Sequence, residues 1–394
     1  MTEEMKNYPP KDAIIDELAS SFDGRIEWYQ YMQENQPIRY RPEYNLWEVF
    51  RYKDVEQVLL DHATFSIDGS QPQGFPGALT KCDPPQHRQL RGLVSKAFTP
   101  RRIEELRPRL IQITDELLEL AIARGKMNVA TEFTYPFPVR VIAEVLGLPP
   151  EDQEQLQQWS GQLVRQFLCV RNPDNNELLH YFSELLNERK YNPHDDLISG
   201  LLAVEENGAH LTREEVIRMC LELLAAGHIT TTLLLNYALH RFCQYPEIYQ
   251  ALRDDPSLIP GAIEEALRYD FPSPNMWRTA RYDTVFNGHE IKAGQYMVAW
   301  KAAANFDETY FPQASQFDIR RSPNPHLTFG YGIHRCLGAP LVRLEGRIAF
   351  ERIITHFSDI RLDPDEPVQY MDKMGSARFI QSFGIIFTPA GFSG

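Results

Sequence analysis

One cysteine lies in a short stretch whose residue types and spacing could support metal chemistry. Cys336 is preceded by Gly330 and Gly332 and followed by Gly338, and an amphipathic segment from Leu337 onward predicts a helix. Glycines permit backbone turns that a Cβ would hinder, and the N–H groups at a helix start favour thiolate over thiol. A thiolate held in this way can ligate a metal or a haem iron. A lone cysteine is more often a small buried hydrophobic residue, so the assignment depends on the surrounding pattern.

The ten residues 329–338, FGYGIHRCLG, match the haem-binding loop of the cytochrome P450 family residue for residue. The chain resembles a soluble bacterial member of that family, and the resemblance implies a haem b whose iron takes Cys336 as its proximal ligand. In such proteins the thiolate pushes electron density toward the iron. The resemblance also makes Phe329, which opens the loop, and His334 cofactor-binding residues, with His334 a ligand of a haem propionate.

A predicted helix beginning near Pro84 or Pro85 carries a possible anion-binding pair. His87 and Arg91 are four residues apart, so they share one helix face and can grip one anionic group together. A solvated polar face is the alternative interpretation. In the P450 family a His and an Arg at this spacing after D-P-P bind the haem propionates. By its position in the family pattern, Arg278 is expected to be a further propionate ligand.

A long apolar segment that starts at Thr212 predicts a helix through the protein core. Thr212 and Glu215 have the spacing of a capping box, and the middle of the segment is apolar on all sides. Within it, AAGHITT at 225–231 places a glycine and threonines where a helix ordinarily prefers Leu or Ala. A threonine hydroxyl can bond the carbonyl of the preceding turn, so a simple helix irregularity is one interpretation.

The P450 resemblance gives this irregularity a catalytic interpretation. Thr230, in a local groove opened beside Gly227, would hold a water on the distal side of the iron and help to deliver protons. The family usually has an acid directly before this threonine, whereas this chain has Ile229. Helix geometry turns His228 about 200° away from residue 230, which disfavours a direct replacement.

Glu265 and Arg268 form an i,i+3 pair in the sequence EEALRYD. Such pairs on a helix surface are usually worth only about a few tenths of a kcal/mol. In the P450 family, however, this ExxR pair is buried on the proximal side and has a third member, an arginine shortly before the cysteine loop. The resemblance therefore implies a structural triad with Arg321, for which Arg320 is the competing choice. Loss of one member would leave an unpaired buried charge.

Composition argues against several other classes of protein. The net charge of −14 disfavours nucleic-acid binding. Five cysteines without a CxxC pair indicate neither a disulfide scaffold nor a zinc site, and favour a reducing compartment. The polar, acidic N-terminus lacks the features of a signal peptide, and no window approaches 18 uninterrupted apolar residues. We therefore expect a soluble, cytoplasmic protein without a membrane anchor.

The remaining pattern predicts a mainly α-helical protein with small β-sheets, folded as one domain over residues 1–394 with the cytochrome P450 fold. Helices are predicted at 54–60, 103–120 (kinked at Pro108), 137–146, 156–170 and 178–188. Hairpins are predicted at 38–51, 284–291 and 378–387, the second around Asn287-Gly288. Residues 66–81, rich in glycine and proline, predict a long irregular loop.

The combined motifs indicate a monooxygenase that inserts one oxygen atom from O₂ into an organic substrate. No GxGxxG motif follows a strand, so a ferredoxin or flavodoxin partner is expected to supply two electrons and to dock near Arg335 and Arg343. A lipophilic substrate is expected, such as a fatty acid, terpenoid, steroid or polyketide. The pocket that would bind it is predicted to be lined by Phe75, Leu79, Leu224, Met276 and Ile380.

Two alternatives stay open at this stage. Because Ile229 replaces the usual acid, the protein could use hydrogen peroxide directly as a peroxygenase, although the retained Thr230 favours O₂. A haem-containing binding or sensor protein, without oxygenase turnover, is an alternative of a different class.

Overall fold

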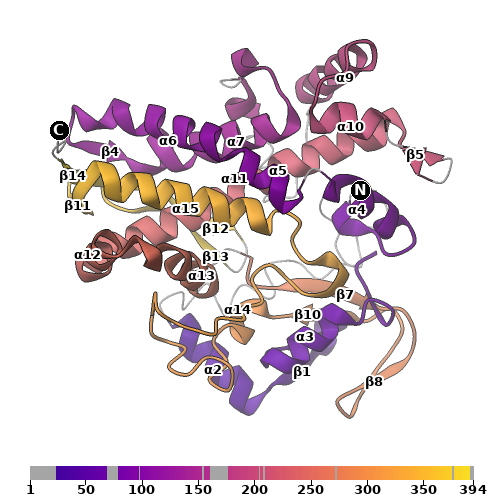
Figure 1. Cartoon of the computed structure of the whole chain (residues 1–394). Coiled ribbons are helices and arrows are strands. Elements are labelled where there is room, and N and C mark those ends of the chain that lie inside the picture. Colours follow the sequence, from indigo (N-terminus) through magenta and orange to yellow (C-terminus); the bar gives the residue numbers. More distant parts are fainter. Residues whose placement is uncertain are drawn as a thin grey trace.

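Helices dominate the part of the chain that the computed structural model describes, which is residues 24–68, 79–96, 98–152, 155–159, 176–203, 205–206, 209–270, 273–374 and 377–390. The helices are α2 (Arg25–Asn35), α3 (Tyr52–Leu60), α4 (Gln86–Ser95), α5 (Pro100–Glu105), α6 (Arg107–Ile122), α7 (Pro136–Leu146), α9 (Asn176–Tyr191), α10 (Leu197–Ala203), α11 (Arg213–Gln244), α12 (Pro246–Asp254), α13 (Ile259–Asp270), α14 (Lys301–Ala304) and α15 (Ala339–His356). In Figure 1, α6, α7 and α15 occupy the upper half of the molecule, and α2 and α3 lie with the largest sheet in the lower half. The predicted fold class, mainly helical with small sheets, is confirmed.

The β-structure consists of small sheets. The largest has the order β1-β2-β10-β7-β3 and is built from β1 (Ile38–Arg41), β2 (Leu46–Val49), β10 (Tyr296–Ala299), β7 (Met276–Ala280) and β3 (Phe65–Ser66). A three-stranded sheet contains β11 (Phe357–Leu362), β14 (Gly384–Pro389) and β4 (Lys126–Asn128). The two-stranded sheets are β12 (Gln369–Met374) with β13 (Ala377–Ser382), β8 (Thr284–Phe286) with β9 (His289–Ile291), and β5 (Glu205–Glu206) with β6 (Ala209–His210).

Two of the three predicted hairpins are confirmed, and the C-terminal one is wrong. β1 pairs with β2, and β8 pairs with β9 across Asn287 and Gly288, both with positive φ. Near the C-terminus, β13 pairs with β12, whereas β14 pairs with β11 and β4. The chain changes sheet at Phe383, which is buried and whose carbonyl accepts the N–H of Val129 (2.9 Å).

The helix predicted over 103–120 is two helices. α5 ends at Glu105 and α6 begins at Arg107, so Pro108 lies in the first turn of α6, where its missing N–H is not needed. The predicted helices 54–60, 137–146 and 178–188 fall within α3, α7 and α9, and the helix near Pro84 or Pro85 is α4. Phe75, most of the loop 66–81 and most of the predicted helix 156–170 lie outside the described residues.

The long predicted helix is α11, which runs for 32 residues through the core. The capping box is present: Oγ1 of Thr212 accepts the N–H of Glu215 (3.2 Å), and Oε2 of Glu215 accepts the N–H of Thr212 (2.7 Å). α11 is long and apolar enough to cross a membrane by composition, but 56% of its most apolar window is buried inside the protein. It packs against α7, α13 and α15, as the core helix of a folded domain does.

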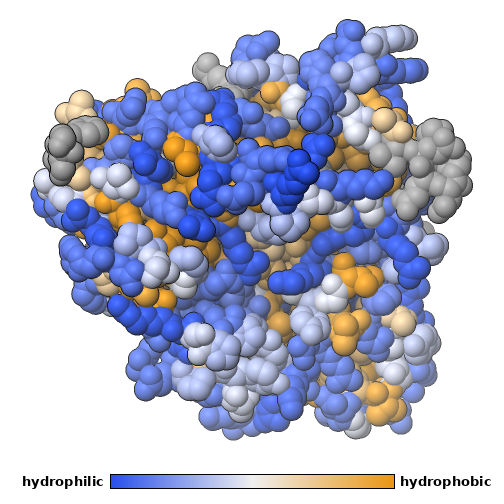
Figure 2. Space-filling model, viewed as in Figure 1, coloured by the Kyte–Doolittle hydropathy of each residue, from blue (hydrophilic) through white to orange (hydrophobic). Residues whose placement is uncertain are grey.

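Two hydrophobic cores meet at the start of the cysteine loop. The first surrounds α11 and includes Phe329, and the second lies between the largest sheet, α2 and α3 and includes Leu327. The surface seen in Figure 2 is mostly hydrophilic, with apolar side chains in patches between the helices. The start of the loop is therefore held by two buried side chains, Leu327 in one core and Phe329 in the other.

Candidate haem-thiolate site

The loop that carries Cys336 is shaped by its own backbone. The N–H of Cys336 donates to the carbonyl of Phe329 (2.8 Å). Gly330 and Gly332 have φ values of 71° and 70°, in the left-handed region that favours glycine. A Cβ on Gly332 would lie 2.9 Å from the carbonyl oxygen of Leu59 in α3. Glycine is thus required both for the turn and for the close packing of the loop on α3.

The thiol of Cys336 is exposed, and its surroundings act on its ionisation in opposite directions. Burial by nearby protein atoms raises its pKa, whereas the N–H groups of Gly338 and Ala339 and the charges of Lys301 and Arg91 lower it. α15 begins at Ala339, two residues later than predicted, and its first N–H groups face the sulfur. Among the described residues, no group of three or more His, Cys, Asp or Glu side chains can hold a bare metal ion. A single sulfur suits an iron whose other ligands come from a macrocycle.

Buried basic side chains beside the loop have polar atoms without hydrogen-bond partners. Arg278, in the middle of β7, is 1% exposed; its Nη1 donates to the carbonyl of Trp277 (2.7 Å), but its Nε and Nη2 have no hydrogen-bond partner. Nε2 of His87 is buried and lacks a hydrogen-bond partner too, Nε2 of His334 is buried 3.5 Å from Oδ1 of Asp83, and the two rings lie 4.2 Å apart. Buried donors without acceptors are costly. Haem propionates would supply the missing acceptors, so these residues fit haem b.

The electrostatics of these groups point to the same kind of ligand. Burial lowers the pKa of Arg278 to about 10 and that of His87 to about 4. Both shifts arise because the charged forms have lost water without gaining a full set of partners. A bound carboxylate would reverse them by favouring the cationic forms.

Asp83 lies just before the N-terminus of α4 and contacts His334. The sequence patterns did not single it out. Its Oδ2 accepts from Oγ of Ser66 (2.5 Å) and Nη2 of Arg281 (2.6 Å), and its Oδ1 lies 3.5 Å from Nε2 of His334. Burial raises the pKa of the Asp83 carboxyl, but His334, Ser66 and Arg281 together hold it well below its usual range. Asp83 is therefore an ionised group that can orient the His334 ring. Its signal in the sequence was the D-P-P start of the His87 helix.

Arg91 lies one turn after His87 on α4, as its spacing predicts. Its Nη2 donates to the carbonyl of Arg335 (2.6 Å), the residue directly before the cysteine. Arg91 therefore contacts the loop itself, next to the expected position of the cofactor.

The face of α11 that carries Thr230 is the less buried side of the helix. Its members, spaced three and four residues apart, are Leu223, Ala226, Gly227 and Thr230, of which Ala226 is exposed and the others are half-buried. Oγ1 of Thr230 donates to the carbonyl of Ala226 (2.9 Å). The lone pairs of the hydroxyl can still accept a hydrogen bond, so this face offers one polar atom in apolar surroundings.

His228 lies on another side of α11 from Thr230. Its side chain is 0% exposed, and its ring packs edge-on against Tyr135 with 4.3 Å between centroids. Burial lowers its pKa to about 3, so the ring is neutral at ordinary pH. Ile229 packs against the core. Neither neighbour of Thr230 on its N-terminal side therefore brings an ionised group to it.

Gly227 lies where α11 packs closely against α7. α11 is continuous through this residue, and a Cβ on Gly227 would lie 2.9 Å from Cδ1 of Ile142 in α7. The glycine therefore allows α7 to pack closely against α11. The expected groove beside Gly227 stays a prediction.

The structure brings Glu265, Arg268 and Arg321 together. Arg268 makes a bidentate pair with Glu265 (2.7 and 2.8 Å), and both side chains are fully buried. Nε of Arg321 lies 3.2 and 3.3 Å from the two carboxylate oxygens of Glu265, whereas Arg320 is exposed. Arg268 also donates to the carbonyls of Asn305 and Ala314 (2.9 Å each). The network thus ties α13 to the segment that leads into the cysteine loop.

The predicted substrate-pocket residues are only partly placed as expected. Leu224 is 0% exposed and packs in the first core, on a different side of α11 from Leu223 and Ala226, and its place in the pocket stays a prediction. Leu79 and Ile380 are also buried in the first core. Met276 is half-buried, and its Sδ would meet a Cβ on Gly330 at 3.4 Å, so it lies against the cysteine loop.

Glu222 is a further residue that the sequence reasoning missed. It is 9% exposed on α11, and its carboxylate accepts the N–H groups of Leu79 (2.9 Å) and Thr80 (3.1 Å) and the hydroxyl of Thr80 (2.5 Å). Glu222 thus anchors the end of the loop 66–81 to the core helix. A single acid inside an otherwise apolar helical run was the available signal.

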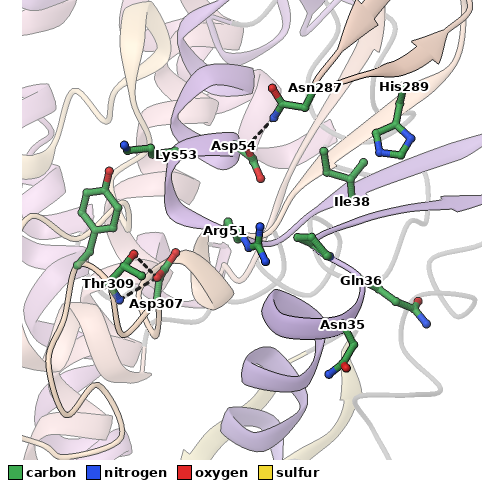
Figure 3. A pocket seen from close by; sticks show the side chains of 12 residues that line it. Asn35, Gln36, Ile38, Arg51, Lys53, Asp54, Asn287, His289, Asp307 and Thr309 are labelled. Atoms are coloured by element: carbon green, nitrogen blue, oxygen red, sulfur yellow. Dashed lines mark hydrogen bonds between the residues drawn. The ribbon is translucent and has the colours of Figure 1, made fainter.

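A separate surface pocket of about 930 Å³ lies away from this site. Figure 3 shows its lining side chains at the end of α2, the start of α3 and the β8–β9 hairpin. The polar groups there have local partners: Asp54 accepts from Asn287 (2.7 Å), and Asp307 accepts from Thr309 (2.6 Å). None of the predicted site residues lines it.

A cysteine loop beside buried basic side chains that can bind propionates fits a haem-thiolate protein. Comparison with known proteins agrees. The sequence model of the family described as Cytochrome P450 matches residues 162–385. The chain belongs to the cytochrome P450 family.

Individual relatives cover nearly the whole chain. The erythromycin C-12 hydroxylase of Saccharopolyspora erythraea is 39% identical over 373 residues, 89% of this chain and 92% of that protein. The cyclomarin C epoxidase of Salinispora arenicola is 40% identical over 380 residues, 91% and 96% of the two chains. A Bacillus megaterium cytochrome P450 crystallised with testosterone superposes with a TM-score of 0.83 at 33% identity, covering 92% of this chain and 98% of that one. The predicted P450 fold is therefore confirmed.

Family membership establishes the class of reaction and the cofactor. The protein is a haem-thiolate monooxygenase, and its cofactor is haem b. Bacterial members of the family generally receive electrons from redox partners and bind lipophilic substrates.

Proposed function

We propose that Cys336 is the proximal ligand of the haem iron in a single domain that spans the chain. The observation that carries this assignment is the coincidence of the exposed Cys336 residue with buried nitrogens of Arg278 and His87 that have no hydrogen-bond partner. A haem b can take a single sulfur as an iron ligand and presents two carboxylates to the protein. Phe329 supports the loop by packing under the guanidinium of Arg343, 4.8 Å from its ring.

When bound, the haem supplies the chemistry of O₂ activation. The residues of this chain would bind and orient it: Arg278, His87, Arg91 and His334 would hold its carboxylates, and the Cys336 loop would supply its sulfur ligand. Thr230 would face the opposite side of the haem, where its oxygen would accept a hydrogen bond from a water while its O–H donates to the carbonyl of Ala226. Since Ile229 and His228 bring no ionised group there, protons reach Thr230 through water.

The carbon monoxide difference spectrum of the reduced protein tests the ligand assignment. Wild type is expected to show the strongly red-shifted Soret band of thiolate ligation, and Cys336→Ser is expected to lose it. Cys82→Ser, at a buried cysteine outside the loop, is the matched control and should keep the band. A red-shifted band that survives Cys336→Ser would overturn the assignment.

We infer that the substrate is a lipophilic molecule, with steroids and polyketide macrolides the first classes to test. The open face of α11 presents Leu223, Ala226 and the methyl of Thr230, and Met276 adds an apolar side chain beside the loop. Relatives are named for hydroxylation of erythromycin and of mycinamicin IV, and a structural neighbour contains testosterone. Fatty acids and terpenoids complete the panel. A shift of the Soret band on titration marks binding, and no shift with any of these four classes would contradict the proposal.

We further propose that the electrons come from a ferredoxin or flavodoxin in the cytoplasm. Arg335 is exposed next to Cys336 and is suited to contact an acidic partner. Arg343 is a weaker candidate than expected, because it forms a bidentate pair with Glu264 (2.6 and 2.7 Å). Arg335→Glu should slow reduction by a surrogate ferredoxin at low ionic strength, and Arg343→Glu should mainly affect stability. Equal reduction rates for Arg335→Glu and wild type would argue against this docking site.

Ile229 favours one second candidate, a peroxide-driven peroxygenase, because no ionised group from residues 228 and 229 reaches Thr230. Turnover of one substrate with hydrogen peroxide and with a surrogate ferredoxin system distinguishes the two. A monooxygenase is faster with the ferredoxin system; a peroxygenase is faster with peroxide. Ligand binding without product under both conditions would instead indicate a binding or sensor protein, and Thr230→Ala would then change little beyond stability.

A further inference from the structure

A buried lysine lies behind the cysteine loop. Lys301 is the first residue of α14 and is 4% exposed, and its Nζ donates to the carbonyl of Thr328 (3.1 Å). A buried ammonium is costly unless nearby groups stabilise its charge. Burial lowers the pKa of Lys301 to about 8, while the charge of Cys336 favours the ammonium and that of Arg278 disfavours it. Lys301 is therefore a basic group enclosed by the protein and held at the entry of the cysteine loop.

The segment that Lys301 binds leads directly into the cysteine loop. Thr328 directly precedes Phe329, whose carbonyl accepts the N–H of Cys336 (2.8 Å). Oγ1 of Thr328 donates to the carbonyl of Leu267 in α13 (2.7 Å) and accepts from Nδ2 of Asn305 (2.9 Å). Lys301 is therefore hydrogen-bonded to a residue, Thr328, that is itself held by Leu267 and Asn305.

The electrostatic relation between the two residues is reciprocal. Nζ of Lys301 binds the backbone carbonyl of Thr328 at the entry of the cysteine loop, and a positive charge there favours the thiolate of Cys336 just as a thiolate favours the ammonium of Lys301. Arg91, the other cation that acts on the sulfur, is half-buried and close to solvent, whereas Lys301 is enclosed. Charges interact most strongly where water is excluded. Lys301 is thus the cation best placed to balance the thiolate from within the protein.

We propose that Lys301 is a positioning residue of the haem site, an internal counter-cation of the Cys336 thiolate that raises the reduction potential of the haem iron. The inference rests on the proposed role of Cys336 as the iron ligand. A fixed positive charge beside the thiolate withdraws electron density from it and favours the reduced, more negative state of the iron–thiolate unit. One electron then enters from the redox partner at a higher potential, and no proton or bond changes at Lys301.

The test is a redox titration of the substrate-free holoenzyme. Lys301→Met keeps the length of the side chain and removes its charge, whereas Lys301→Arg keeps the charge. Lys301→Met is expected to shift the one-electron reduction equilibrium toward the oxidised state by tenfold or more, equivalent to about 59 mV. Lys301→Arg should shift it less, and Lys53→Met, at an exposed lysine, should not shift it.

Each outcome decides the proposal. An unchanged potential in Lys301→Met with a retained red-shifted carbon monoxide band would overturn the counter-cation role and leave the Cys336 assignment intact. Loss of that band in wild type would defeat both. Unchanged potential with faster loss of haem would assign Lys301 to propionate binding and equally overturn the proposal. If Lys301→Met fails to retain haem, Lys301→Gln is measured with the same expectation.

Discussion

At the residue scale, the cofactor site is a set of buried donors that the protein alone leaves unsatisfied. Nε and Nη2 of Arg278 and Nε2 of His87 have lost water without gaining acceptors. Such groups lower the stability of the haem-free protein, because their desolvation is not compensated. A bound carboxylate would supply the missing hydrogen-bond acceptors. Binding strength and empty-protein stability are therefore expected to respond in opposite directions to one substitution.

Arg278→Met tests this coupling. The variant is expected to lose haem at least about tenfold faster, because charge-assisted hydrogen bonds contribute about 1.5–3 kcal/mol. The haem-free variant should be as stable as wild type or more stable, since a buried guanidinium is removed. Haem transfer to an acceptor apoprotein and urea unfolding of the haem-free chain measure the two effects. Arg101→Met, at a highly exposed arginine, is the control; equal haem loss in both variants would contradict the role of Arg278.

Thr230 is expected to couple electron use to product formation. Its hydroxyl is the one polar side-chain group on the open face formed by Leu223, Ala226, Gly227 and Thr230. Thr230→Ala should divert electrons to peroxide and lower product per electron pair by roughly tenfold or more, in the range of proton-transfer effects. Thr230→Ser keeps the hydroxyl and should retain most of the coupling. Product and peroxide are measured together in a surrogate electron-transfer system, and unchanged coupling in Thr230→Ala would exclude this role.

At the element scale, the ion network of α13 connects the long helices to the cysteine loop. Glu265 accepts from Arg268 and Arg321 and also from the N–H of Asp318 (2.9 Å). These contacts lie along the segment that ends at the loop. The geometry of the loop therefore depends on a carboxylate about 70 residues before it in sequence.

Neighbouring arginines provide a matched test of this network. Arg321→Met leaves Glu265 short of one cation and is expected to lower the free energy of unfolding by about 3 kcal/mol or more. Arg320→Met removes an exposed side chain and should change it by less than about 0.5 kcal/mol. Urea unfolding of both variants decides the matter. Similar stabilities would show that Arg321 does not belong to the network.

At the scale of the whole molecule, buried titratable groups link stability to pH. His228 has a pKa of about 3 in the folded protein because of burial, compared with about 6.5 in an unfolded chain. Below pH 6.5 the unfolded chain therefore binds a proton that the folded protein does not. Stability falls as the pH drops through this window.

His228→Phe is expected to flatten this dependence, since phenylalanine retains the ring contact with Tyr135 but does not titrate. Between pH 7 and pH 5 wild type should lose about 2 kcal/mol more than the variant. Urea unfolding at the two pH values measures the difference. The same loss in both proteins would show that His228 does not carry the acid sensitivity.

Much of the site follows from local sequence. Three motifs each lie within fewer than a dozen residues: the cysteine loop, the Thr212 capping box and the ExxR pair. Local backbone geometry sets the spacing within each motif, so the sequence alone predicts it. The mainly helical class follows from periodicity in the same way.

Only the tertiary structure decided which distant groups complete these motifs. In the structure Arg321, and not Arg320, pairs with Glu265. Leu224 is buried in the core whereas Ala226 is exposed, and β13 and β14 belong to different sheets. The tertiary structure also brought Asp83 to His334 and Lys301 to the base of the cysteine loop. The reason is physical: a side chain's partners are set by packing between elements far apart in sequence, and neither spacing nor composition encodes that contact directly.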